Sequence, residues 1–122
     1  MIPLPPRFKA GSFEAVIQTF QTRDKAFREL DEMFKTDIHD HLGYLSKAFM
    51  YRKAIEYLQT EVAQGTNKED ALISLSHDTE DRLHNLALEF PDHSSSDELF
   101  DIKVGLILLK DDLEKHEKLS HF

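Results

Sequence analysis

Apolar residues recur at steps of three and four along almost the whole chain, and this period constrains the fold more than any other feature. Phenylalanines follow one another every seven residues from Phe13 to Phe34, and the same pattern of steps runs through residues 44–62, 72–90 and 99–113. Steps that average 3.5 residues keep one stripe of a helix facing its neighbours in a bundle. No stretch alternates polar and apolar residues with the period of a strand. The pattern therefore predicts an all-α protein.

Turn and capping residues divide this periodic sequence into segments. Ser12 follows a glycine and is a predicted N-cap, and Gly65 ends the second segment. Thr66 and Glu69 have the spacing of a capping box, and Pro91 stops the third segment. These signals predict four helices, over residues 12–35, 38–64, 67–90 and 96–119.

Four helices of about 23 residues joined by short connections predict an antiparallel, up-and-down four-helix bundle. We expect one helical-bundle domain over residues 12–122, preceded by an extended, proline-rich arm at 1–11. The junction near residues 35–38 contains neither glycine nor proline. One continuous helix from 12 to 64 is the alternative, and such a rod would have to pair with a second chain.

Charge and composition exclude several classes of function. The chain of 122 residues carries 15 Lys and Arg against 23 Asp and Glu, for a formal net charge of −8. Nucleic-acid binding requires a basic surface, so we expect no nucleic-acid partner. The absence of cysteine excludes disulfides, thiolate metal sites and cysteine nucleophiles. Apolar runs are too short to cross a membrane, and the N-terminal residues do not resemble a secretory signal, so a cytoplasmic location is predicted.

The last predicted helix has more apolar residues than one core-facing stripe needs. The core stripe is complete with Leu99, Ile102, Leu106, Leu109 and Leu113, yet four further apolar residues cover much of the remaining circumference: Phe100, Val104, Ile107 and Leu108. A helix that is apolar on most sides is normally buried on more than one side. The alternative is a central helix covered by the arm through Ile2 and Leu4.

We interpret this surplus as a partner-binding surface. The sequence therefore predicts a non-enzymatic protein–protein interaction module, either a homodimer or an adaptor- or chaperone-like subunit, whose partner is another protein or a second copy. No catalytic residues and no cofactor belong to this interpretation.

Clustered histidines and carboxylates support an alternative function in metal binding or phosphotransfer. His77, Glu80 and His84 share one helical face and could ligate a divalent metal ion through nitrogen and oxygen atoms. His39 and His41 form a second cluster between aspartates, where a metal site or a phosphoacceptor histidine is conceivable. The competing interpretation of both clusters is a solvated helix surface.

The seven histidines predict that self-association depends on pH. Protonating all of them would change the formal net charge from −8 to −1, mostly around the ordinary histidine pKa of about 6.5. Charge repulsion between copies falls as this happens. We therefore expect larger species as the pH is lowered from about 7.5 to about 5, measured by sedimentation velocity; an unchanged distribution would contradict the prediction.

Overall fold

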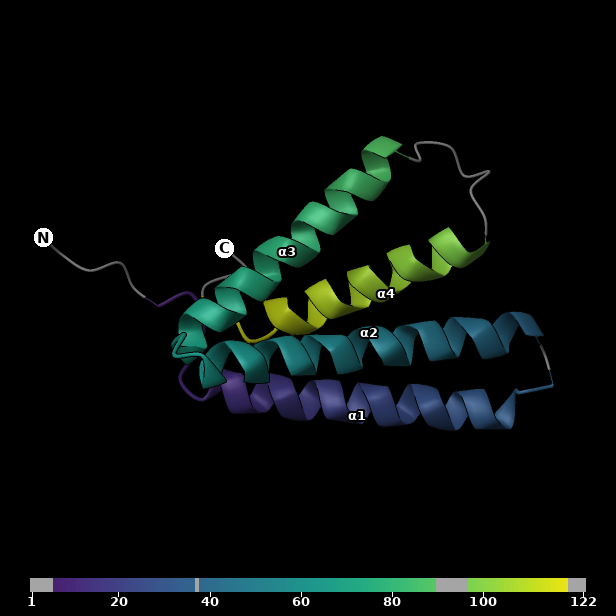
Figure 1. Cartoon of the computed structure of the whole chain (residues 1–122), viewed down its shortest axis with the longest axis horizontal. Coiled ribbons are helices and arrows are strands. Elements are labelled where there is room, and N and C mark those ends of the chain that lie inside the picture. The colour runs from purple at the N-terminus through teal and green to yellow at the C-terminus, as the bar shows by residue number, and fades with distance from the viewer. Residues whose placement is uncertain (1–5, 37, 90–96, 119–122) are drawn as a thin grey trace, which may run out of the picture.

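The computed structural model shows an all-helical chain and confirms the predicted fold class. It describes residues 6–36, 38–89 and 97–118, without the side chains of 38–42, 89, 97 and 98. Within these ranges there are four helices and no strand: α1 (Ser12–Met33), α2 (Ile38–Ala63), α3 (Lys68–Glu89) and α4 (Asp97–Glu114). Figure 1 shows α1 and α2 side by side along their lengths, whereas α3 diverges from α2 toward its C-terminal end.

The first two helices are separate, so the alternative of one continuous helix is wrong. Helix α1 ends at Met33, where the backbone N–H of Phe34 donates to the carbonyl oxygen of Leu30 at 3.0 Å. The phenylalanine repeat then packs on α2. The ring of Phe20 meets Tyr51 edge-on at 5.3 Å between centroids, and Phe27 stacks on the same tyrosine at 6.1 Å. Aromatic packing of this kind adds to the area that each ring buries.

The start of α1 differs from the predicted cap. Gly11 occupies the N-cap position with a left-handed φ of 78°, and no side chain caps the helix. Ser12 is buried, and its hydroxyl donates to the carbonyl oxygen of His116 at 3.3 Å. Gly11 makes the turn into the helix in its left-handed conformation. The Ser12 side chain therefore does not cap the helix and instead joins the N-terminal and C-terminal parts of the described chain.

The predicted capping box at the start of α3 is also wrong. Asn67 caps the helix, since its Oδ1 accepts from the backbone N–H of Asp70 at 2.8 Å. The Thr66 hydroxyl donates to Glu61 instead. The Glu69 carboxylate points toward the N-terminal residues rather than back to the cap.

A terminal clasp, consisting of residues 7–9 and 116–118, joins the two ends of the described chain. Phe8 forms an isolated antiparallel bridge with Glu117, flanked by bonds from Lys9 N–H to the His116 carbonyl (3.0 Å) and from Lys118 N–H to the Arg7 carbonyl (2.8 Å). Phe8 is only 2% exposed and belongs to the core. The clasp explains why α4 ends at residue 114 rather than at 119.

The clasp also holds α3. One carboxylate oxygen of Glu69 accepts the backbone N–H groups of Arg7 (2.6 Å) and Phe8 (3.1 Å). The Arg7 guanidinium pairs with Glu117 at 2.9 Å and reaches Glu80 at 3.6 Å. The arm predicted at 1–11 is thus described from residue 6 onward, and Ile2 and Leu4, the alternative cover for the last helix, lie outside the described residues.

A buried carboxylate connects three helices. Asp112 of α4 is 1% exposed and accepts two bonds of 3.1 Å from the Arg23 guanidinium of α1. It also accepts the Tyr51 hydroxyl of α2 at 2.7 Å. Burial and this bond raise the pKa of Tyr51, and the bonds to Asp112 raise the pKa of Arg23.

We predict that Asp112→Ala destabilises the protein by about 2–3 kcal/mol. The substitution leaves the buried Tyr51 hydroxyl without its acceptor and Arg23 without its partner. Because Arg23 stays half-exposed and can be hydrated, the loss of unfolding free energy is smaller than the loss expected on breaking a fully buried ion pair. Urea unfolding followed by circular dichroism measures the change.

The neighbouring carboxylate provides a matched control. Asp111 is exposed on the same helix, so Asp111→Ala removes the same charge and is expected to change stability by less than about 0.5 kcal/mol. Equal effects of the two substitutions would show that the network around Asp112 is not responsible.

Candidate interaction surface on the last helix

Helix α4 packs against α2 through one narrow side. A Cβ atom added to Gly105 would lie 2.5 Å from the sulfur of Met50, so the absence of a side chain allows the helices to approach closely. One turn earlier, Asp101 pairs with Lys47 at 3.2 Å between Nζ and Oδ1. Lys47 is itself buried, at 9% exposure. These contacts define the side of α4 that faces α2.

Two of the surplus apolar residues, Phe100 and Ile107, lie away from that side. With about 100° between successive residues, Phe100 and Ile107 lie about 140° and 160° around the helix from Gly105. Phe100 is 63% exposed and Ile107 is 40% exposed. Val104 is half-buried, and Leu108 is half-buried and packs against the core. We call these four residues the apolar α4 face.

A groove and an adjoining hollow lie near Leu108, the last residue of the apolar α4 face. The groove has a volume of about 640 Å³ and lies between α1 and the C-terminal part of α4, from Thr19 and Ala26 to Lys115. A smaller adjoining hollow, of about 260 Å³, reaches Leu108. The Arg23–Asp112 pair lines both. Leu108 therefore borders open, partly polar surface.

Other exposed apolar side chains lie on the other helices. Met33 is 73% exposed on α1, Phe49 is 58% exposed on α2, and Leu88 is 67% exposed on α3. Single exposed apolar residues are normal on a protein surface. Phe100, Val104 and Ile107 follow one another on successive turns of α4, and Leu45, at 40% exposure, lies one turn from Phe49 on α2. Such rows are how a helix presents a contact surface.

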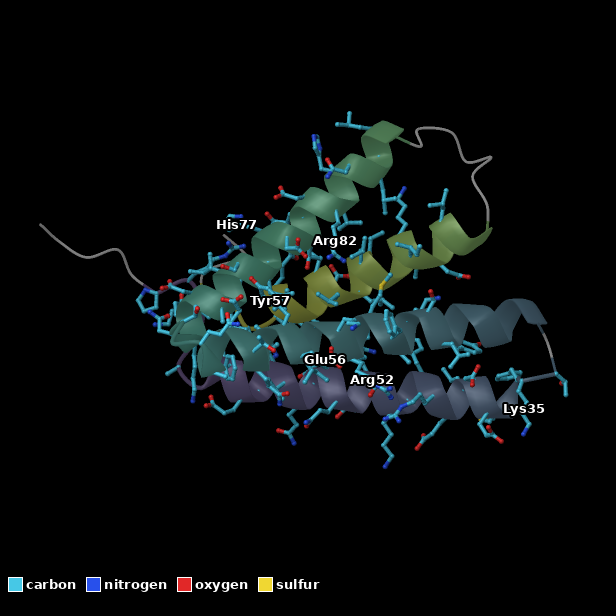
Figure 2. All side chains as sticks on the ribbon, viewed as in Figure 1. Lys35, Arg52, Glu56, Tyr57, His77 and Arg82 are labelled. Atoms are coloured by element: carbon cyan, nitrogen blue, oxygen red, sulfur yellow. The ribbon has the colours of Figure 1, made fainter. Side chains whose placement is uncertain are left out.

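The predicted metal ligands on α3 lie at the surface. His77 is exposed, and its Nδ1 is 4.0 Å from Glu80 Oε2; Figure 2 shows His77 on the outer side of α3. Glu80 also contacts Arg7 of the clasp, and His84 is exposed. A metal site of this kind needs a group of histidine, aspartate or glutamate side chains. Among the side chains described in residues 6–36, 38–89 and 97–118, no group of three or more is placed to hold a metal ion. The side chains of His39 and His41 lie outside that set.

Comparison with known proteins adds no relative: no protein-family model, no curated protein and no solved structure matches this chain. Among the described residues, no helix has the length and apolar character needed to cross a membrane.

His116 lines the groove between α1 and α4, together with Asp112 and Lys115. Burial lowers its pKa below the usual value of 6.5, the nearby charge of Lys9 lowers it further, and Asp112 acts in the opposite direction. The unfolded chain therefore takes up this proton at a higher pH than the folded protein does. The contribution of His116 to the free energy of unfolding is complete at pH values above its pKa in the unfolded chain. This contribution falls as the pH drops below that pKa.

We predict that His116→Gln reduces the loss of stability between pH 7.5 and pH 5.5. The glutamine keeps the backbone carbonyl that Lys9 and Ser12 use, and it removes the proton that destabilises the folded state at low pH. Urea unfolding at both pH values measures the difference. His84→Gln, at an exposed position of α3, is the control and is expected to retain the parent's pH dependence; a His116 variant that behaves like this control would contradict the prediction.

Proposed function

We propose that this chain is a non-enzymatic protein–protein interaction module that self-associates through the apolar α4 face. The exposure of Phe100 and Ile107, on the side of α4 away from α2, supports the proposal most directly. The same surface supports an adaptor- or chaperone-like role, because exposed apolar residues can bind another protein without any catalytic residue.

The amount of apolar surface sets the expected strength of this association. Burying the exposed fractions of Phe100 and Ile107 contributes about 1.5–3 kcal/mol per copy, on a scale of about 1.5–3 kcal/mol for a whole large side chain. A symmetric dimer gains this twice, for about 3–6 kcal/mol. Association itself costs about 4 kcal/mol at the least and up to about 15 kcal/mol or more. We therefore expect a weak, concentration-dependent dimer rather than an obligate one.

The proposal includes the finer features predicted from the sequence. The short connections after residues 33 and 63 support an antiparallel, up-and-down order of the helices. The net charge of −8 supports a protein partner rather than a nucleic acid. The composition suits a cytoplasmic location.

The main prediction concerns Ile107→Glu. Because Ile107 is partly exposed, a glutamate there can reach water in the monomer, and the far-UV helix signal is expected to stay within about a tenth of the parent. In the dimer the same carboxylate would be desolvated against the partner, so the dissociation constant is expected to rise at least about tenfold. Light scattering after size-exclusion chromatography, over a series of protein concentrations, measures the mass.

A matched control comes from α3. Leu88→Glu makes the same change in charge and removes a similar exposed apolar side chain, at 67% exposure, from another helix. It is expected to leave the mass distribution unchanged. A parent protein that stays monomeric at every concentration would refute self-association, and equal effects of the two variants would refute the apolar α4 face as its site.

A further inference from the structure

A second surface feature lies on another side of α4, where α3 diverges from α2. A cleft with a volume of about 160 Å³ opens between these two helices, with α4 contributing to its wall. A cavity of about 150 Å³ holds one benzene molecule. The cleft is therefore the size of one aromatic ring or a short alkyl chain, and too small for the row of side chains that a partner helix would insert.

The inner part of the cleft is apolar. Leu75 of α3 and Leu106 and Leu109 of α4 line it, each no more than 5% exposed. Phe49 and Met50 of α2 line it as well. A methionine thioether adapts its shape to different ligands, and an aromatic wall suits a planar ring. This environment favours an apolar group over water.

Two cations lie on opposite helices of the same cleft. Lys53 comes from α2 and Arg82 from α3; Figure 2 shows Arg82 and Tyr57 in the space between α3 and the neighbouring helices. Among the described residues that line the cleft, Asp78 is the one carboxylate. The lining thus has an excess of positive charge, in a chain whose net charge is −8.

Both cations have partners that a ligand can replace. Lys53 Nζ is 3.4 Å from Glu56 and 5.3 Å from the centre of the Phe49 ring, and Arg82 is 3.1 Å from Asp78. All four charged side chains are more than half exposed. Exposed pairs within one helix contribute little to stability, so their cations can turn toward another carboxylate at small cost.

We propose that this cleft binds a small amphipathic carboxylate, with an aromatic ring or short alkyl chain in its apolar interior and the carboxylate facing Lys53 and Arg82. This site is separate from the apolar α4 face, and its ligand is a small molecule rather than a protein. The proposal therefore does not depend on self-association.

Three probes that share one phenyl ring and one three-carbon chain test the class of ligand. They are 3-phenylpropionate, its neutral amide, and 3-phenylpropylamine, each titrated into the parent protein labelled with nitrogen-15. We expect the carboxylate to bind at least about threefold more tightly than the amide, and the amine most weakly. The changes in amide chemical shift are expected at Met50, Ala54, Thr79 and Leu106, which line the cleft.

Charge-removing variants test the two cations. Lys53→Gln combined with Arg82→Gln is expected to abolish the preference for carboxylate over amide while the ring still binds. Lys25→Gln combined with Lys103→Gln removes the same charge from exposed positions outside the cleft and is expected to keep the preference. Both variants change exposed side chains, so the fold is retained.

Several results would overturn the proposal. Equal affinities for the three probes would show that the cations do not select the ligand. Shift changes confined to Phe100, Val104, Ile107 and Leu108, the apolar α4 face, or no binding of any probe at about 10 mM, would show that the cleft is not the site. Loss of the carboxylate preference in the control variant would assign it to overall charge instead.

Discussion

The arrangement of the helices depends most on the hydrogen bonds that the Asp112 carboxylate accepts. This carboxylate lies in α4, it is almost completely buried, and its bonding partners come from α1 and α2. A buried charge is tolerated only where its hydrogen bonds are satisfied, so the three helices must meet in one register for the carboxylate to be stable. Apolar packing alone would allow them to slide by about two turns, since the phenylalanine repeat presents similar rings at every seventh residue.

That register gives α4 two different sides. Gly105 and the Lys47–Asp101 pair bring one side against α2 at close range. Phe100 and Ile107 then turn outward, while Leu106 and Leu109 line the cleft beneath α3. One helix of 18 residues thus contributes to the core, to an exposed apolar surface and to a cleft. This explains how its sequence can be apolar around most of its circumference without all of it being core.

The helices could be predicted from the sequence because their period and their breaks are local. Residue pairs three and four apart reveal α1 to α4, and the predicted ends of the first three lie within about two residues of the observed ones. The exposure of Phe100 was anticipated for the same reason, since the core stripe of α4 was already complete without it.

The polar contacts could not be predicted, because their partners are far apart in the chain. Arg23 and Asp112 are 89 residues apart, and Arg7 and Glu117 are 110 apart. Glu69 has the spacing of a capping residue and still bonds to the N-terminal segment. The cleft depends on the angle at which α3 leaves α2, and no residue pattern encodes that angle by itself.

The terminal clasp has a consequence for how the protein acquires its structure during synthesis. Phe8 leaves the ribosome 109 residues before its bridging partner Glu117 does. A nascent chain can form α1 and α2 early, because their contacts are close in sequence, but it cannot seal Phe8 into the interior until Glu117 has emerged. The aromatic side chain must therefore stay accessible to chaperones or other nascent polypeptides until that residue has been synthesised.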